Sequence, residues 1–298
     1  MAQNLNQRAR RLVTGIPLAW LILLFLLPFL IVLKLSFSQE QLAIPPFAPL
    51  LHWVNGLPHP SLHVGNYTFL FTDPLYISAY LYSLKVALVS TLLCLLLGYP
   101  MAYVIARSEG TARSVLLMLV ILPFWTSFLL RVYAWIGLLK HNGVINNVLM
   151  YLGLIHQPLT MLQTDFAVYV GIVYSYLPFM ILPLYANLEK HDVALLEAAA
   201  DLGARPVMTF LRVTLPQSVP GILAGSLLVF IPAVGEYVVP SLLGRTDQLM
   251  IGRVLSDEFF ENRDWPLASA VAILMLLLLV VPIMLFQRSG GRQMESHR

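Results

Sequence analysis

Six long apolar stretches constrain the fold of this chain more than any other feature of its sequence. Each holds roughly 20 or more mostly apolar residues, the length that a helix needs to cross a lipid bilayer. They cover 16–35, 80–106, 115–139, 166–188, 219–240 and 267–286. Because lipid offers no partner for open backbone N–H and C=O groups, such stretches cross a membrane as helices. The sequence therefore predicts an all-α membrane protein with six transmembrane helices.

The composition supports this prediction, because only 11% of the 298 residues are charged and 58% are hydrophobic. A soluble chain of this size is usually about a quarter charged, so most of this surface must face lipid. The net charge of +3 is too small to indicate nucleic-acid binding. The one cysteine, Cys94, cannot form an intrachain disulfide, and we expect it to pack in an apolar environment.

Basic residues are unevenly distributed between the segments that connect the spans. If the N-terminus is cytoplasmic, the cytoplasmic segments hold 11 of the 18 basic residues: Arg8, Arg10, Arg11, Arg107, Arg113, Lys190, Arg205, Arg212, Arg288, Arg292 and Arg298. The outer loops hold Lys140, Arg245, Arg253 and Arg263. The positive-inside rule therefore places both termini in the cytoplasm, as tails 1–15 and 289–298 around a six-helix transmembrane domain, 16–288. The first apolar stretch is too long for a signal peptide, so we expect it to be retained.

The first outer loop, 36–79, carries three histidines, His52, His59 and His63. His59 and His63 are four residues apart, which is a metal-ligand spacing on a helix, but Pro60 between them disfavours a helix. No carboxylate lies nearby in the sequence. We expect an ordinary loop surface here and no metal site.

Two short helices are predicted outside the bilayer between the fourth and fifth spans, over 194–202 and 205–213. Asp192 is a suitable N-cap, because its carboxylate can accept from the open amides of the first turn. Gly203 suits the left-handed position that ends a helix. Pro206 fits the first turn of the second helix, where its missing N–H costs little.

The same segment, 189–217, resembles a known family. Glu197-Ala198-Ala199, Gly203 four residues later, and Leu215-Pro216 a further twelve and thirteen residues on have the pattern of the EAA motif. This motif is typical of the permease subunits of binding-protein-dependent ABC importers. The resemblance implies a coupling helix that docks on an ATPase subunit through Glu197, Ala198, Ala199, Asp201 and Gly203.

The resemblance also implies the partners and the location. A dimer of ATPase subunits would bind ATP and Mg, a second homologous permease would complete the pore, and a periplasmic or extracellular binding protein would deliver the cargo at the bacterial inner membrane. The chain itself has no G-x-x-x-x-G-K-[ST] sequence and no catalytic pattern, so we expect neither an enzyme nor a bound cofactor. An ion-gradient-driven transporter is the alternative, and it would require acidic residues inside the spans.

The cargo is indicated by resemblance in other segments. These segments are 130–135, 142–147, 231–237, 240–244, 249–252 and 262–266. They resemble polyamine permeases, above all the putrescine-type permease of the spermidine/putrescine group, which implies putrescine or else spermidine as the cargo. Permeases for iron or sulfate share the EAA motif and are the alternative within the family.

Glu236 is the one carboxylate well inside a predicted span, and an acid in that position is a functional candidate by default. It follows Pro220 by 16 residues, which places it about 24 Å along the fifth span. Arg131 lies at a similar depth, about 27 Å along the third span. The carboxylate could therefore contact a cationic cargo, or it could form an ion pair with Arg131.

Aromatic side chains near this depth could also contact a polyamine, since cation–π contacts are worth roughly 0.5–2 kcal/mol each. Tyr169 and Tyr176 share one face of the fourth span, and Tyr237 and Trp125 add further aromatic surface. Packing or an interfacial belt is the alternative for all four. Gly221 and Gly225 form a small-xxx-small pair that favours a close helix crossing, which we expect against the partner permease.

Overall fold

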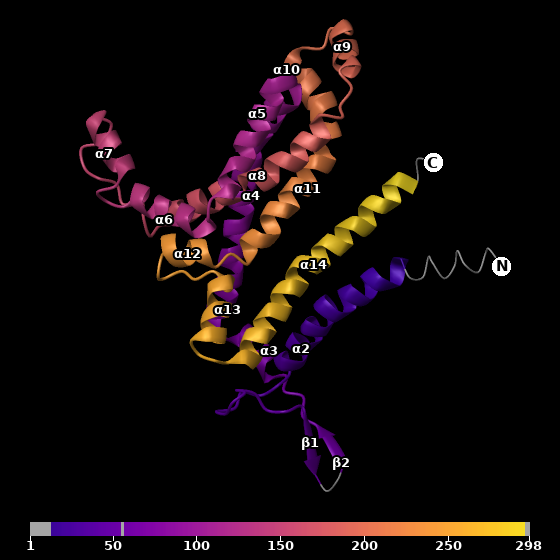
Figure 1. The fold of residues 1–298 in the computed structure, drawn as a ribbon, viewed down its shortest axis with the longest axis vertical. Helices are drawn as coiled ribbons and strands as arrows, with labels where there is room; N and C mark the ends of the chain where they lie inside the picture. The colour runs from indigo at the N-terminus through magenta and orange to yellow at the C-terminus, as the bar shows by residue number, and fades with distance from the viewer. Residues whose placement is uncertain (1–12, 55–56, 296–298) are drawn as a thin grey trace, which may run out of the picture. The chain divides into compact units, whose positions relative to one another are not determined.

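The computed structural model describes residues 13–54 and 57–295. In this part of the chain the regular structure is helical apart from one short hairpin, so the all-helical prediction is right in outline (Figure 1). The chain divides into two units, which are residues 78–253 and the residues up to Ile77 combined with residues 254–298. Arg8, Arg10, Arg11 and Arg298, which contribute to the predicted orientation, lie outside the described residues.

The unit formed by the two ends of the chain is built on two apolar helices. Its elements are η1 (Ile22–Leu26), α2 (Leu27–Ser36), β1 (Leu51–Val54), β2 (Leu57–Pro60), α3 (Gly65–Thr72) and α14 (Trp265–Glu295). Helix α2 packs against α14, which also contacts α3. The N-cap of α14 is Asp264, whose Oδ1 accepts the N–H of Leu267 at 2.9 Å. Asp264 thereby satisfies one of the open amides at the start of this helix.

The predicted loop 36–79 is more regular than expected. Strands β1 and β2 pair antiparallel, with His52 opposite His59, and α3 follows them. The side chains of these two histidines lie outside the described residues, whereas His63 is described and exposed. Among the described residues there is no group of three or more His, Cys, Asp or Glu that could hold a metal ion.

The unit of residues 78–253 contains the remaining helices. They are α4 (Pro74–Arg107, which begins in the other unit), α5 (Gly110–Ile121), η2 (Leu122–Trp125), α6 (Phe128–Leu139), α7 (Val144–Tyr151), α8 (Asp165–Leu188), α9 (Ala194–Asp201), α10 (Pro206–Thr209), η3 (Phe210–Thr214), α11 (Leu215–Val234), α12 (Val238–Leu243) and the start of α13 (Ile251–Phe260). Helix α8 is central, because α5, α6, α11 and α12 all contact it. Cys94 on α4 is fully buried in the same core, which confirms its predicted packing role.

The crossing of α8 and α11 depends on two glycines. A Cβ atom added at Gly225 would lie 3.0 Å from the carbonyl oxygen of Met180, and one at Gly221 would lie 2.7 Å from the Cβ of Asn187. Real side chains do not fit at such distances, so the two backbones approach closely only because both residues lack a side chain. The predicted close crossing is confirmed, but its partner is α8 of the same chain rather than the second permease.

Four described helices are long and apolar enough to cross a membrane, namely Val13–Ser36, Pro74–Arg107, Asp165–Leu188 and Pro206–Val234. They correspond to the first, second, fourth and fifth predicted spans. The fifth ends at Val234 instead of 240, because the chain breaks at 235–237 before α12 begins. The sixth predicted span, 267–286, lies wholly within helix α14, Trp265–Glu295.

The third predicted span, 115–139, is not one straight helix. The segments Gly110–Trp125 and Phe128–Tyr151 meet at an angle of 91°. Pro123 lies in the tight turn η2 directly before this break, and it has no N–H to continue the helical hydrogen-bond ladder. The apolar run alone could not reveal the bend, because both sides of it are equally hydrophobic.

Candidate functional site

The exposed helix α9 lies between the fourth and fifth spans, where the coupling helix was predicted. The Oδ1 of Asp192 accepts the N–H of Ala194 at 2.9 Å, so this carboxylate satisfies an open amide of the first turn as expected, although Val193 and not Asp192 occupies the N-cap position. The regular helix begins at Ala194 and ends at Asp201. The predicted helix 194–202 is thus confirmed to within one residue.

The end of α9 is a Schellman motif. Gly203 has a φ of +79°, its N–H donates to the carbonyl of Ala200 at 2.8 Å, and the N–H of Ala204 donates to that of Ala199 at 3.0 Å. These two bonds satisfy carbonyls that the helix leaves open, and the left-handed conformation favours glycine. The predicted role of Gly203 in ending the helix is confirmed.

Most of the residues predicted to dock on the ATPase are accessible. Glu197, Ala198, Asp201 and Gly203 are exposed, and Ala199 is half-buried. The sequence analysis missed Leu202, whose side chain is 89% exposed directly beside the Gly203 turn. A large apolar residue in a segment predicted to lie outside the bilayer was the available signal. The surface combines carboxylates, small side chains and one protruding apolar residue.

The second short helix, predicted over 205–213, is in fact the start of the fifth span. Elements α10, η3 and α11 follow one another without a gap, so one helix runs over Pro206–Val234. Pro216 has no N–H for a regular α-helical bond, and the π-helical turn η3 directly precedes it, with the N–H of Leu215 donating to the carbonyl of Phe210. The helix therefore continues through Pro216 and far beyond 213, where we expected it to end.

An ion pair between Arg113 and Glu189 joins the start of this segment to helix α5. The Nη1 of Arg113 lies 2.6 Å from the Oε1 of Glu189, and the Nε of Arg113 donates to the carbonyl of Ser108 at 2.8 Å. The start of α5 is thus joined to the end of α8. In the sequence, Arg113 and Glu189 were only charges in separate loops.

A second group of candidate residues surrounds Glu236, which lies in the break between α11 and α12. This side chain is only 7% exposed. Its Oε1 accepts the N–H groups of Val238 and Val239 at 3.1 and 3.3 Å, and its Oε2 accepts the hydroxyl proton of Tyr176 on α8. The carboxylate therefore caps the start of α12 and joins it to α8.

The ion pair with Arg131, one of the two alternatives for Glu236, is not formed among the described residues. The guanidinium carbon of Arg131 instead lies 5.6 Å from the ring centre of Phe124 and 5.7 Å from that of Phe128. Its Nε and Nη1 are buried without a hydrogen-bond partner in the described part of the chain. The carboxylate accepts from two amides and a hydroxyl instead, and the cation lies against two aromatic faces.

Aromatic rings connect these two charged groups. The ring centres of Phe124 and Phe179 are 5.2 Å apart, and those of Phe179 and Tyr176 are 6.1 Å apart. The contacts thus run from Arg131 through Phe124, Phe179 and Tyr176 to Glu236. The sequence analysis missed both phenylalanines, although Phe179 is three residues beyond Tyr176 and so shares its helix face.

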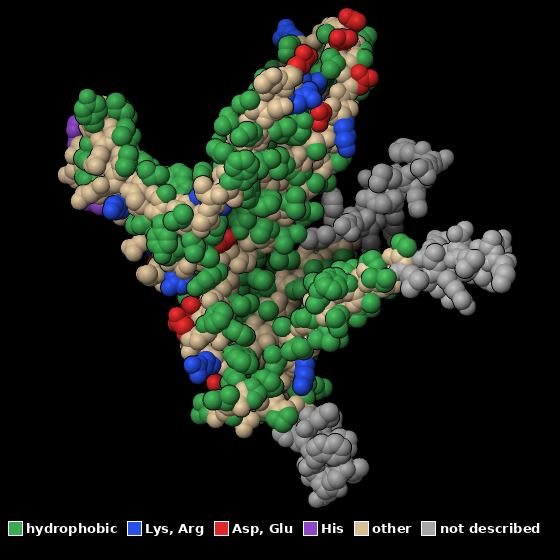
Figure 2. Space-filling model, viewed as in Figure 1, with side chains coloured by type: hydrophobic (Ala, Val, Ile, Leu, Met, Phe, Trp, Pro, Cys, Tyr) green, Lys and Arg blue, Asp and Glu red, His purple; other side chains and the backbone are tan. Residues whose placement is uncertain are grey.

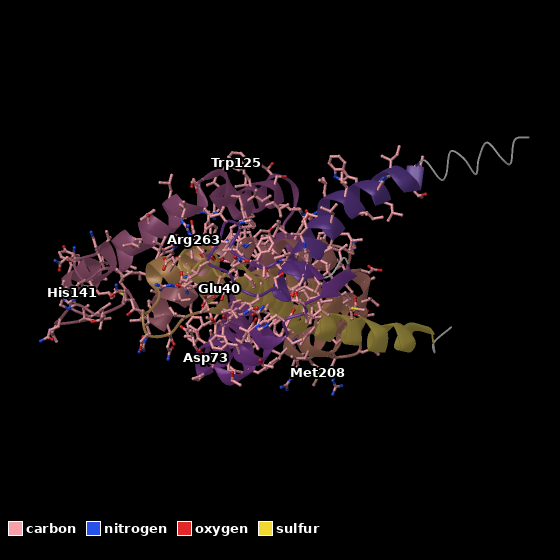
Figure 3. All side chains as sticks on the ribbon, turned by 90° about the horizontal axis from the view of Figure 1, so that it is seen from below. Glu40, Asp73, Trp125, His141, Met208 and Arg263 are labelled. Atoms are coloured by element: carbon pink, nitrogen blue, oxygen red, sulfur yellow. The ribbon has the colours of Figure 1, made fainter. Side chains whose placement is uncertain are left out.

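The other predicted aromatic residues are not part of this run. Trp125 is 73% exposed at the end of η2, and Figure 3 shows it at the edge of the molecule. Tyr237 is 44% exposed next to Glu236 in the same break. Tyr169 is half-buried near the start of α8, two helical turns from Tyr176. Of the four predicted aromatic residues, only Tyr176 contacts the carboxylate.

Apolar spanning helices joined to the exposed helix α9, which carries Glu-Ala-Ala and ends at a glycine turn, define the permease subunit of an ABC importer. Such a subunit is a multi-pass inner-membrane protein and a pore component rather than an enzyme. The chain belongs to the family described as "Binding-protein-dependent transport system inner membrane component", which it matches over residues 94–294.

Comparison with individual proteins agrees with this assignment. The chain is 40% identical to the spermidine/putrescine transport system permease protein PotB of Haemophilus influenzae, over 96% of each chain. It is also 40% identical to PotB of Escherichia coli, over 91% of this chain and 94% of that one. The crystal structure of a bacterial alginate ABC transporter in complex with its alginate pentasaccharide-bound periplasmic protein has the same fold, with a TM-score of 0.70 at 20% identity over 99% and 98% of the two chains.

Proposed function

We propose that this permease moves polyamines, putrescine or spermidine, into the cytoplasm. The observation that carries the proposal is the buried carboxylate of Glu236, hydrogen-bonded to Tyr176 at one end of a run of aromatic rings. Ammonium groups are attracted to a carboxylate and to aromatic faces, and a polyamine carries at least two such groups on a flexible chain. The names of the relatives at 40% identity, which include spermidine and putrescine, support the same cargo.

Within this proposal Glu236 and Tyr176 contact the cargo directly. The three bonds to the carboxylate leave lone-pair capacity, because an ionised carboxylate has about four acceptor positions. Tyr237 and Trp125 offer accessible aromatic surface at the two helix breaks, and Tyr169 offers it further along α8. Arg131 carries a charge that repels a polyamine, so the path of the cargo follows the Glu236 side of the cluster.

The energy for transport comes from a separate ATPase dimer, which binds ATP and Mg. Helix α9 docks on it through Glu197, Ala198, Ala199, Asp201 and Gly203, together with the exposed Leu202. The termini are cytoplasmic, and the bent pair α5–α6 takes the place of the third of six spans in the permease domain, 16–288. A second homologous permease and a periplasmic polyamine-binding protein complete the importer.

The test is uptake by the reconstituted importer. The chain, its second permease and its ATPase would be placed in proteoliposomes with the binding protein, and labelled putrescine and spermidine would be supplied with and without ATP inside. We expect ATP-dependent uptake of at least one polyamine. Uptake of sulfate or molybdate with neither polyamine transported would refute the proposed cargo. Uptake by this chain alone under a proton or sodium gradient would refute the proposed energy source.

A further inference from the structure

The segment 141–164, which contains α7, has an unusual composition for a connection between membrane helices. It contains no Asp, Glu, Lys or Arg. A water-exposed segment of this length normally carries several charges. Figure 2 shows mainly hydrophobic side chains over α7. Water is therefore a poor environment for this part of the chain.

Helix α7 carries apolar residues on both of its sides, and Asn147 is its one exposed polar residue. Ile145, Leu149 and Met150 are turned inward and are partly covered, whereas Val144 and Tyr151 are exposed, Tyr151 to 91%. Val148 and Leu152 are exposed as well. Apolar side chains on two sides of a helix favour an apolar cover on both of these sides. In the isolated chain, the exposed apolar residues of α7 are thus left open to solvent.

This apolar surface is held in a defined arrangement. Asn146 is fully buried, and its Nδ2 donates to the carbonyls of His141 at 3.0 Å and Leu159 at 2.9 Å. Its Oδ1 accepts the N–H of Leu159 at 2.9 Å. One amide side chain therefore joins the chain before α7 to the chain after it, and the exposed residues form a fixed surface.

The direction of the segment follows from the break in the third span. Helix α5 packs against the spanning helix α8. The segment Phe128–Tyr151, which includes α7, makes an angle of 91° with Gly110–Trp125. When α5 crosses the bilayer, the chain beyond the break consequently runs along the bilayer instead of across it. This segment lies at the start of α8, whereas α9 follows its other end.

We propose that residues 141–164 lie in the lipid–water boundary at the end of α8 opposite to α9, with Val144, Val148 and Tyr151 inserted among the lipids. The partner is a lipid surface, because the segment continues from a membrane-embedded helix and has no charged residues for the polar rim that protein interfaces carry. A tyrosine with an apolar ring and a polar hydroxyl suits this boundary. A helix whose apolar face enters the boundary anchors the segment there.

The test uses the assembled importer in lipid nanodiscs, in a Cys94→Ala background. An environment-sensitive fluorophore is attached to Val148→Cys or to Tyr151→Cys. The control is Thr246→Cys, an exposed residue beside the Arg245–Asp247 ion pair. We expect lipids that carry a spin label near the headgroup to remove most of the fluorescence at 148 and 151 but little at 246, and aqueous iodide to do the reverse.

Two outcomes would overturn the proposal. Iodide quenching at 148 and 151 as strong as at 246 would place the segment in water. Quenching by neither reagent, with fluorescence that changes when the binding protein or the second permease is omitted, would identify a protein partner instead. Either result would leave the proposed cargo untouched, since the measurement needs no transport.

Discussion

Substitutions of Glu236 distinguish its two roles, as a cap for α12 and as a contact for a cationic cargo. Glu236→Ala removes the acceptor for the amides of Val238 and Val239 and the partner of Tyr176. Loss of a cap costs roughly 0.5–2 kcal/mol, and loss of a hydrogen bond to a charged group costs about 1.5–3 kcal/mol. We expect Glu236→Ala to destabilise the permease by about 2–5 kcal/mol.

Glu236→Gln keeps a carbonyl oxygen for the two amides and an amide group that can donate to the Tyr176 hydroxyl. Charge-assisted hydrogen bonds are roughly twice as strong as neutral ones, so this change should cost only about 1 kcal/mol of stability. Because it removes the negative charge, it should still reduce polyamine uptake at limiting substrate by about tenfold, which corresponds to roughly 1.4 kcal/mol.

The assay pairs thermal unfolding of the detergent-solubilised complex with ATP-dependent uptake in proteoliposomes. Tyr176→Phe separates the hydrogen bond from the charge, because it removes one hydrogen bond to Glu236 but keeps the carboxylate and the aromatic ring in place. Glu236→Gln with wild-type uptake would show that the charge does not serve the cargo. Glu236→Ala with wild-type stability would show that the capping argument is wrong.

Three further changes test other parts of the structure. The Cβ that Gly203→Ala adds meets no atom within 4 Å, so the loss of stability comes from the left-handed backbone, about 1–2 kcal/mol. We expect this variant to co-purify with less ATPase and to show less ATP-driven uptake. Unchanged ATPase binding would contradict this role of the turn. Gly225→Leu should destabilise by at least about 1–3 kcal/mol through the clash with Met180, and Gly137→Ala, which meets nothing within 4 Å, is the control in the same melting assay. Burial raises the pKa of the Asp264 carboxyl, so folding favours its protonated form, and its contribution to stability should fall as pH rises from the unfolded pKa, about 3.9, to the raised folded value. Asp264→Asn should therefore weaken the dependence of the free energy of unfolding on pH in that window. The same pH dependence in the variant and the wild type would refute this.

The sequence predicted those features that depend on local chemistry. The ends of α9 follow from Asp192 and from the left-handed tolerance of Gly203, and both are properties of a few neighbouring residues. The close crossing at Gly221 and Gly225 was likewise visible as a spacing, although its partner was not. A pattern of small residues predicts a close contact with another helix, but it does not identify that helix, because any apolar helix could pack there.

Features that depend on distant residues could not be predicted in this way. Depth along two straight helices placed Arg131 near Glu236, but the third span bends by 91°, and the carboxylate has nearer partners in Tyr176 and the α12 amides. Hydrophobicity does not distinguish a straight apolar run from a broken one. The positions of Phe124 and Phe179 in the cluster follow from that bend and from helix packing.

The uninterrupted helix Pro206–Val234 has a mechanical consequence. Its 29 residues form a rod about 43 Å long. One end starts at the turn that follows α9, and the other end stops two residues before Glu236. A tilt of about 5° at the first end would displace the second by ~4 Å, which exceeds the length of the hydrogen bond that Glu236 accepts from Tyr176 on α8. If α9 docks on an ATPase as proposed, this helix can act as a lever that converts a small rotation at its α9 end into the release of the buried carboxylate at its other end.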